Sequence, residues 1–300
     1  MMIYVKVTLC RCSDQPFIAL KPAIFVSKLS NLNNSNLPKI IWILWLQGLD
    51  KAPIEVKKCY ESWVRHHPDW EVVFLDENDI AKYITLPGRQ VAKYVVSEIL
   101  RINLLAKYGG VWVDATCYCM KPLDEWLPEY MDAGFFAFER PGPDRMLSSW
   151  FLASAKYNYI TNAWQNRVNT FWKENPALRL IKDTRWNFIY KKLKNANPQI
   201  WFNSLFTKIL KVHPYFWFHY SFEYIYLRDA SFSEAWDSVP KFSADIPHSL
   251  QFAGLFTPVT EEIKQEIAQK KSPIYKLTWK YKPEELQPGT VMDYLLNSSH

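Results

Sequence analysis

The residues with the clearest chemical potential in this chain are an acid and an arginine, followed by a second acid. Glu98 and Arg101 stand three positions apart, and Asp114 closes an apolar run that starts after Gly109-Gly110. A carboxylate at the end of a buried strand lies at the edge where open α/β sheets bind ligands. An acid at that edge beside an arginine indicates recognition of a metal–diphosphate, as in a nucleotide-sugar.

A long helix from Gln90 to Tyr108 is predicted to carry Glu98 and Arg101. The apolar residues that share one face, at about 100° per residue, are Val91, Val95, Ile99, Ile102 and Ala106. Glu98 lies at the edge of this face and Arg101 further round the same flank, so both are expected to be half buried in one cleft. The alternative is a surface ion pair, which would contribute only about 0.3–0.5 kcal/mol. Ser97 belongs either to the same cleft or to the solvated helix surface.

Gly109-Gly110 is predicted to end this helix through a left-handed cap and to lead into the next strand. Side chains alternate between the two sides of a strand with a period of two. Trp112, Asp114 and Thr116 are therefore expected on one side, where the last two would present oxygens next to each other. The alternative for Asp114 is a simple strand-end cap.

The segments before this helix alternate between strand and helix patterns. Lys39 to Leu46 is an aromatic and β-branched run typical of a buried strand, and Glu71 to Leu75 is a second strand. Between them, Pro53 favours the first turn of a helix that Pro68 ends. Asp76 is a suitable N-cap for a short helix after the second strand. This alternation predicts a parallel sheet and an α/β fold.

The rest of the chain is less regular. Residues 1–37 are a lead-in with no assigned role, and one main domain is predicted over residues 38–300. Residues 160–195 have a mainly helical pattern, and residues 201–226 are dense in aromatic side chains. The alternation over residues 276–282 fits either an edge strand or a closing loop.

Composition narrows the class of protein. With 49% hydrophobic and 16% aromatic residues in 300, the chain can bury a sizeable core. Its longest strongly apolar run, Ile40 to Leu46, is far shorter than the about 20 residues that span a membrane, and no clean signal peptide is present. We therefore expect a cytoplasmic protein that can contact a membrane peripherally. The net charge of +6 favours an anionic partner, but without a run of five basic residues nucleic acid is not expected.

Five cysteines without a secretion signal favour reduced thiols. Cys10-x-Cys12 and Cys117-x-Cys119 together offer four thiolates to a zinc ion. Their one-residue spacing is shorter than that of the usual zinc knuckle. Buried or surface thiols are therefore the preferred interpretation.

In its strand and helix patterns the sequence resembles the sugar-binding region of glycosyltransferase family 32. More closely, it resembles the bacterial capsular polysaccharide synthesis branch of that group. The resemblance rests on Leu37 to Ile41, Ser97 to Arg101 and Gly109 to Asp114, and its strong part covers about residues 38–125. It implies a GT-A-like fold, in which a Rossmann-like α/β domain with helical additions binds a nucleotide-sugar.

The resemblance also implies roles for individual residues. Asp114 would hold a divalent cation, Mn²⁺ or Mg²⁺, with the donor diphosphate, as the acid of a DxD-type motif. Glu98, where the family pattern has Asp, and Arg101 would orient the donor sugar or ribose next to Ser97. Trp45 matches the position of an aromatic residue that stacks on the base, and core packing is the alternative.

Thr116 is the main departure from the family, because the general DxD motif has a second Asp at this position. One carboxylate and one hydroxyl are a poor site for Mn²⁺ or Mg²⁺, which prefer several oxygens. Diphosphate oxygens, waters and a group from the C-terminal tail would have to complete the shell around Asp114 and Thr116. The Asp-Ala-Thr form resembles the capsular branch, so we expect an active enzyme.

The C-terminal tail is predicted to contribute Thr278, Trp279 and Lys280 to substrate binding. As a closing loop it would bring Lys280 or Lys276 to the leaving diphosphate, where negative charge develops. The alternative is an ordinary edge strand without a role in the site.

The resemblance divides the domain into a nucleotide-sugar-binding half, residues 38–140, and an acceptor half with the C-terminal tail, residues 141–300. The aromatic block at residues 201–226 would help to form the acceptor side. The histidines that are candidates for an acceptor cleft are His213, His219 and His248. Hydrogen-bonded structural histidines are the more common alternative.

These expectations combine into a retaining glycosyltransferase. It would move a hexose or N-acetylhexosamine from a nucleotide-sugar, with a UDP-sugar favoured, to a growing capsular or other surface polysaccharide. The acceptor would be a glycan or a lipid-linked glycan. The alternatives are a GDP-mannose-type mannosyltransferase and a catalytically inactive nucleotide- or glycan-binding protein. Nucleic-acid binding would rest on charge and aromatic content alone.

Overall fold

The computed structural model describes residues 37–86, 91–193 and 197–298. Five strands form its central sheet, in the spatial order β2-β1-β3-β6-β5. Their bounds are Ile40–Leu44 (β1), Glu71–Leu75 (β2), Gly110–Asp114 (β3), Phe135–Gly142 (β5) and Arg145–Ser154 (β6). β1 pairs in parallel with both β2 and β3, whereas β6 is antiparallel to β3 and β5. This mixed sheet between helices confirms the predicted α/β class.

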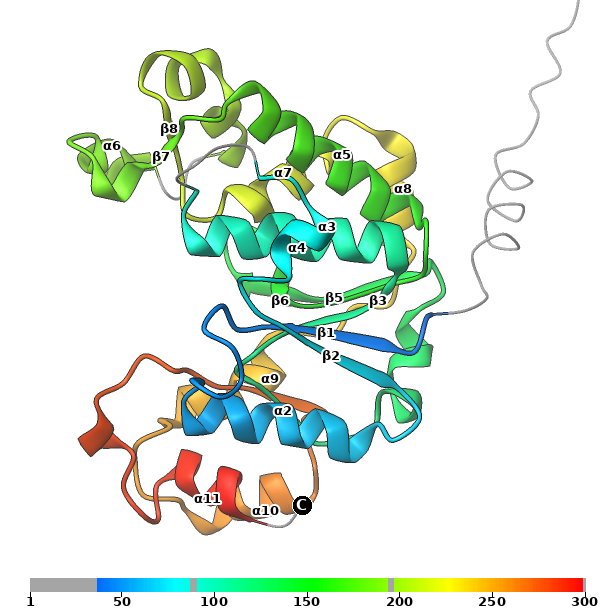
Figure 1. Cartoon of the computed structure of the whole chain (residues 1–300), viewed down its shortest axis with the longest axis vertical. Helices are drawn as coiled ribbons and strands as arrows, with labels where there is room; N and C mark the ends of the chain where they lie inside the picture. The colour runs from blue at the N-terminus through cyan, green and yellow to red at the C-terminus, as the bar shows by residue number, and fades with distance from the viewer. Residues whose placement is uncertain (1–36, 87–90, 194–196, 299–300) are drawn as a thin grey trace, which may run out of the picture.

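Helices cover both faces of the sheet (Figure 1). One face carries α3 (Ile80–Tyr83), α4 (Lys93–Tyr108), α5 (Tyr159–Glu174), α7 (Trp217–Tyr226) and α8 (Ala230–Asp237). The other face carries α2 (Ile54–His66), α9 (Asp245–Ala253), α10 (Glu261–Ala268) and α11 (Val291–Asn297). Successive residues of a strand enter different cores, because Trp42 and Trp112 pack on the α4 side while Ile41 and Val111 pack on the α2 side.

Smaller elements extend this three-layer arrangement. Two short sheets consist of β4 (Cys117–Cys119) with β9 (Ile274–Lys276) and of β7 (Arg179–Leu180) with β8 (Val212–His213). The remaining helix α6 spans Asn187–Leu193. Short 3₁₀ segments span Leu123–Glu125, Leu127–Tyr130, Ile181–Asp183, Pro198–Phe202 and Pro283–Glu285, and a π-helical turn spans Leu205–Ile209. The β4–β9 pair joins the C-terminal tail to the chain that directly follows β3.

Several predicted elements are confirmed and others are corrected. The strand over Glu71–Leu75 is confirmed, and the tail forms an edge strand only as far as Lys276. The expected N-cap role of Asp76 is wrong, because α3 begins at Ile80 and Asp79 immediately precedes it. The Asp76 carboxylate instead accepts a hydrogen bond from the backbone N–H of Asn78, which closes a local turn. The predicted helical stretch at 160–195 holds α5 and α6, with β7 and a 3₁₀ turn between them.

Other predictions concern thiols, aromatic side chains and membranes. Cys59, Cys117 and Cys119 are buried free thiols, whereas Cys10 and Cys12 lie outside the described residues, as does most of the lead-in. The aromatic block is largely core, since Trp201, Trp217, Phe218, Tyr220 and Phe222 are almost fully buried. Within the described ranges, no helix combines the length and the apolar character that a membrane crossing needs.

Candidate functional site

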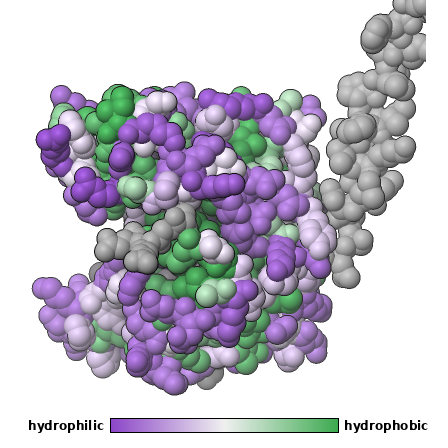
Figure 2. All heavy atoms as spheres, turned by 45° about the horizontal axis from the view of Figure 1, so that its top comes forward, coloured by the Kyte–Doolittle hydropathy of each residue, from purple (hydrophilic) through white to green (hydrophobic). Residues whose placement is uncertain are grey.

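The predicted site residues gather at the carboxyl edge of the parallel strands. Leu44 at the end of β1 is in register with Leu75 of β2 and with Asp114 of β3. These ends lie at the left of Figure 1, and Figure 2 shows a notch between the upper and lower halves of the molecule on that side. Ligands of open α/β sheets bind at this edge.

The turn from α4 to β3 fixes the start of the strand that carries Asp114. Gly109 and Gly110 have φ angles of 70° and 92°, in the left-handed region that favours glycine. A Cβ on Gly110 would lie 2.5 Å from the carbonyl oxygen of Ile40, and one on Gly109 would lie 2.8 Å from the backbone nitrogen of Lys156. The predicted glycine cap is confirmed, because only glycine fits this close approach to neighbouring backbone.

Asp114 and Arg101 form an ion pair across the junction between β3 and α4. The distance from Arg101 Nη2 to Asp114 Oδ1 is 3.3 Å, and the Trp112 indole N–H donates to the same oxygen over 3.1 Å. The Arg101 side chain is 6% exposed and that of Asp114 is 33% exposed. Asp114 is therefore held from the protein side and still reaches solvent at the strand end.

Arg101 is held by neighbours on nearly every side. Its guanidinium donates to Ser97 Oγ over 3.0 Å, to the Ser97 carbonyl over 3.4 Å and to the Ser149 carbonyl. The group also lies over the Trp112 ring, 4.9 Å from its centroid. Most of its N–H groups are used by the protein. Arg101 and Ser97 therefore orient Asp114, and Arg101 is more buried than the half-buried position that the helix pattern predicts.

Glu98 is also buried rather than half buried. It is 7% exposed, and its Oε2 atom has no hydrogen-bond partner among the described residues. Burial raises its pKa to about 8; Arg101 opposes this shift and Asp114 adds to it. The Trp217 indole lowers the pKa slightly, although its N–H is not in hydrogen-bonding geometry. Glu98 is therefore protonated at pH 7 and can donate a hydrogen bond.

The burial of Glu98 has a tertiary cause. α4 packs against α5 as well as against the sheet. On the same side, the guanidinium carbon of Arg101 lies 5.8 Å from the ring centroid of Phe218 in α7. A second helical layer therefore covers the flank that the sequence pattern assigns to an open cleft.

Two tryptophans from distant segments meet near the end of β1. The Trp45 and Trp279 rings are edge-to-face, with centroids 5.5 Å apart. Trp45 is partly buried and its indole N–H has no partner among the described residues, whereas Trp279 is 50% exposed. The pair offers an aromatic surface beside the carboxyl edge, as base stacking would need, while Trp45 also contacts the core on the α2 side.

Thr116 is buried and its hydroxyl is engaged by the tail. Lys276 donates from Nζ to Thr116 Oγ1 over 2.5 Å, and the Leu277 backbone N–H donates to the Thr116 carbonyl over 2.8 Å. Beyond this contact, Thr278 accepts a bond from the Lys280 backbone N–H, and the exposed Lys280 ammonium lies near the Trp279 ring. The tail thus reaches the site, with Lys276 as its innermost charge.

Both side chains of the predicted Mn²⁺ or Mg²⁺ site already have positively charged partners. Asp114 already faces the Arg101 guanidinium, and Thr116 already faces the Lys276 ammonium. No cluster of three or more histidine, cysteine or acidic side chains in the described ranges is arranged to hold a metal. Hard cations prefer several oxygen ligands, and two neighbouring positive groups oppose a third.

A cavity that the sequence did not indicate lies beside the β5–β6 hairpin. It has a volume of about 880 Å³, and its lining includes Arg140, Arg145, Glu223, Trp236 and Lys241. These residues come from the hairpin, α7, α8 and the loop before α9. They fall in segments whose sequence pattern is irregular or dominated by core aromatics, so no local signal joins them.

His248 lies on α9, with its Nδ1 atom 2.6 Å from the Ala244 carbonyl oxygen. Burial lowers the pKa of His248, and its bond to Ala244 opposes this shift. His213 and His219 are buried, and their pKa values are lowered mainly by burial, as for structural histidines.

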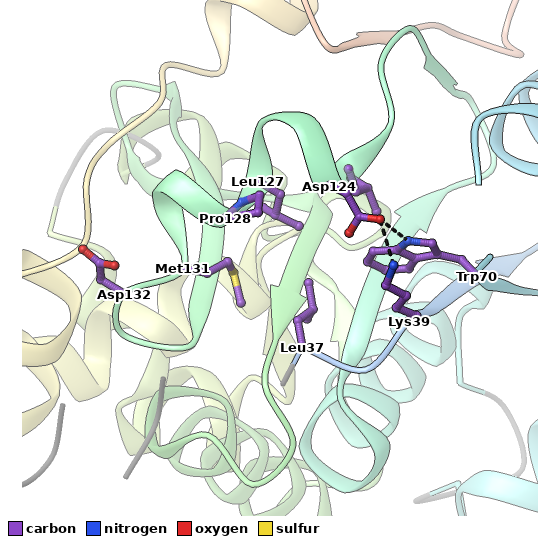
Figure 3. Close-up of a pocket in the computed structure, with 9 residues that line it drawn as sticks. Leu37, Lys39, Trp70, Asp124, Leu127, Pro128, Met131 and Asp132 are labelled. Atoms are coloured by element: carbon purple, nitrogen blue, oxygen red, sulfur yellow. Dashed lines mark hydrogen bonds and ion pairs between the residues drawn. The ribbon is translucent and has the colours of Figure 1, made fainter. Parts of the chain in front are cut away.

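Another pocket, of about 340 Å³, opens at the opposite edge of the sheet (Figure 3). In it the Asp124 carboxylate points toward Lys39 and Trp70, accepting bonds of 3.0 and 3.1 Å. Lys39 directly precedes β1, so this pocket lies at the amino end of the strand. None of the predicted site residues lines it.

Comparison with known proteins places the chain in a family. A family model described as capsular polysaccharide synthesis protein matches residues 19–181 and 179–295. The chain belongs to this family. The predicted resemblance to the capsular branch is thereby confirmed, and the match extends well beyond the strand and helix patterns that suggested it.

Part of the chain is also similar to parts of several curated enzymes. O-glycosyltransferase braB of Annulohypoxylon truncatum is 28% identical over 160 residues, which cover 45% of this chain and 38% of the relative. Initiation-specific alpha-1,6-mannosyltransferase of Candida albicans is 26% identical over a match that covers 30% of this chain and 27% of the relative. Inositol phosphoceramide mannosyltransferase 1 of Schizosaccharomyces pombe is 24% identical over a match that covers 43% of this chain and 42% of the relative. The chain thus spans less than half the length of each of these relatives.

Among solved structures, PaToxG Glycosyltransferase aligns with 82% of this chain and 91% of its own. The sequence identity is 14% and the TM-score is 0.35, a likeness too distant to bear on the fold. The α/β class of the chain follows instead from its own sheet and from the helices on both faces of that sheet.

Proposed function

We propose that this protein is a glycosyltransferase that binds its nucleotide-sugar donor at the carboxyl edge of β1 and β3. The observation that carries the proposal is the Arg101–Asp114 pair at the end of β3, with a protonated Glu98 behind it. An oriented carboxylate that still reaches solvent is suited to the hydroxyl groups of a sugar or ribose. The glycosyltransferase names of the partial relatives support the same class.

The donor would lie along the carboxyl edge, with its base at the Trp45–Trp279 pair. The partly exposed Trp279 ring offers a face to a planar base. Ordering this rigid ring on binding costs less conformational entropy than ordering a flexible side chain. Asp114 would then accept hydrogen bonds from the sugar. Glu98 lies under the helical layer, so it would keep the region behind Asp114 uncharged rather than contact the sugar. Arg101 and Ser97 would act as positioning residues for Asp114.

The acceptor would enter through the 880 Å³ cavity beside the β5–β6 hairpin. Its charged side chains, which include Arg140, Arg145 and Glu223, can form hydrogen bonds with a hydroxyl-rich glycan. Strand β6, which starts at Arg145, also carries the Ser149 carbonyl that accepts a hydrogen bond from Arg101. The family name supports a capsular or other surface polysaccharide as acceptor. A retaining transfer fits a site without a dedicated nucleophile, because the leaving diphosphate can take the acceptor proton itself.

A UDP-sugar carrying a hexose or N-acetylhexosamine is the favoured donor. A GDP-mannose donor is the second candidate, because two of the partial relatives are named as mannosyltransferases. The two donors differ in their base and in the configuration of their sugar. The same carboxyl edge would recognise both features.

A panel of nucleotide-sugars tests the proposal. We expect one nucleotide class to raise the melting temperature selectively and to be cleaved slowly to free nucleoside diphosphate without an acceptor. Stabilisation without release of nucleoside diphosphate, even with added glycans, would identify an inactive binding protein. Absence of both stabilisation and cleavage across the panel would refute the proposal.

A further inference from the structure

We propose that the ammonium group of Lys276 neutralises the donor diphosphate, so that this protein transfers sugar without a divalent cation. The inference rests on the proposed function and concerns how the same site handles charge. It makes Thr116 the residue that positions Lys276, in place of a metal ligand.

The position of Lys276 is fixed by main-chain pairing as well as by its side chain. Lys276 ends β9 opposite Cys117 of β4, and the next residue, Leu277, donates its backbone N–H to the Thr116 carbonyl. The ammonium then donates to Thr116 Oγ1 over 2.5 Å and to the Leu277 carbonyl over 3.3 Å. Lys276 is thus built into the turn that directly follows Asp114.

The ammonium contacts Thr116, two residues after Asp114, and has no ion-pair partner among the described residues. No carboxylate of the described residues forms an ion pair with Lys276, and two of its three N–H donors have assigned acceptors.

The charge balance at this edge favours an anion over a cation. Among the four groups around Asp114 and Thr116, Arg101 and Asp114 neutralise each other, burial favours the protonated form of Glu98 at pH 7, and the Lys276 ammonium is left with no acidic partner. A divalent cation would enter a region that is already positive. A diphosphate would supply the missing counter-charge, and lysine is an established phosphate-binding group in proteins.

The reaction step balances without a metal. The bond between C1 of the donor sugar and the diphosphate oxygen breaks, and its electron pair stays on that oxygen. The acceptor oxygen forms the new bond to C1 and passes its proton to the leaving diphosphate. Lys276 stabilises the negative charge that develops on the diphosphate, where fixed donors contribute most to rate.

The experiment compares nucleoside diphosphate binding and sugar transfer in EDTA and in Mn²⁺. For the wild-type protein we expect UDP or GDP affinity and transfer rate in EDTA to be within about 3-fold of the values in Mn²⁺. Lys276→Gln should weaken nucleoside diphosphate binding about 10- to 100-fold in EDTA, as expected for loss of a charged phosphate contact. Lys276→Arg should recover part of the loss. Lys271→Gln, which removes an exposed lysine outside the site, is the matched control.

Thr116→Val provides a second variant of nearly equal volume that keeps the lysine charge. We expect it to lower affinity for the nucleoside diphosphate less than Lys276→Gln does, with an unchanged melting temperature. Binding and transfer that need Mn²⁺ and are indifferent to Lys276→Gln would overturn the inference and leave the proposed function intact. If no nucleotide binds in either condition, the proposed function falls, and this inference falls with it.

Discussion

The two edges of the central sheet each hold an acid paired with a base, yet in different surroundings. At the amino end, Lys39 and Asp124 are 3.0 Å apart with side chains 52% and 55% exposed. At the carboxyl end, Arg101 and Asp114 are 3.3 Å apart, and the arginine is almost fully buried. The shorter pair is the more solvated one, so distance alone does not identify the functional edge.

Burial explains why only one of these pairs is suited to chemistry. Water and salt screen the Lys39–Asp124 pair, and exposed pairs of this kind contribute about 0–1 kcal/mol. Arg101 is fixed by Ser97 and Ser149, so Asp114 keeps one orientation. The same burial raises the pKa of Glu98. A site with a perturbed acid at a strand end is the stronger functional candidate.

Of the substitutions at the two edges of the sheet, loss of the Asp114 charge should have the largest effect on sugar transfer. Asp114→Asn keeps the shape but removes the negative charge, and we expect sugar transfer to fall about 100-fold or more. The melting temperature should also fall by several degrees, because the variant leaves the buried Arg101 unpaired. Rate assays with the best donor, together with circular dichroism to verify the fold, measure both effects. Near wild-type turnover would show that Asp114 is structural.

The pH dependence of stability should report on Glu98. In the unfolded chain its carboxyl has a pKa near the ordinary value of 4.5, whereas in the folded protein the pKa is about 8. Between these values the folded state holds one proton more, so the free energy of unfolding decreases as pH rises, by up to about 1.4 kcal/mol per pH unit. The contribution is greatest below pH 4.5 and is lost by pH 8.

Glu98→Gln isolates that contribution from the other titrating groups. The variant mimics the protonated acid, so its stability should decrease less than that of the wild type between pH 5 and pH 8. Urea unfolding at several pH values measures the difference. Parallel curves for the two proteins would show that Glu98 titrates normally.

Removal of the exposed ring should affect the donor more than the fold. We expect Trp279→Ala to raise the KM for the nucleotide-sugar about 5- to 10-fold, which corresponds to one lost aromatic contact. Its melting temperature should change little, because Trp279 is already 50% exposed. Titration with the free nucleoside diphosphate checks the affinity directly, and an unchanged value would remove Trp279 from the donor site.

The smallest effect is expected at the amino edge. Asp124→Asn should leave sugar transfer within about 2-fold of wild type and change the free energy of unfolding by less than about 1 kcal/mol. The assays used for Asp114→Asn provide the direct comparison. A large loss of transfer at Asp124 would mean that the pocket in Figure 3 takes part in the reaction and that the contrast between the two edges is wrong.

Local sequence patterns determined much of the scaffold. The strand Glu71–Leu75, the helix ending at Tyr108 and the glycine turn to Asp114 follow from short-range periodicity and from backbone angles that favour glycine. Because the glycine turn sets where β3 begins, the strand ends with Asp114 at the carboxyl edge. The family resemblance added Trp45 and the expected roles of the site residues.

Only the tertiary structure decided how the charges meet. The contact of Lys276 with Thr116 joins positions 160 residues apart, and the packing of α5 and α7 buries Glu98 and Arg101 on a flank that was expected to be open. Periodicity reports which side of an element is apolar, but not which distant segment will cover it. The protonation of Glu98 and the engagement of Thr116 both depend on that covering layer, so they became visible only in the folded chain.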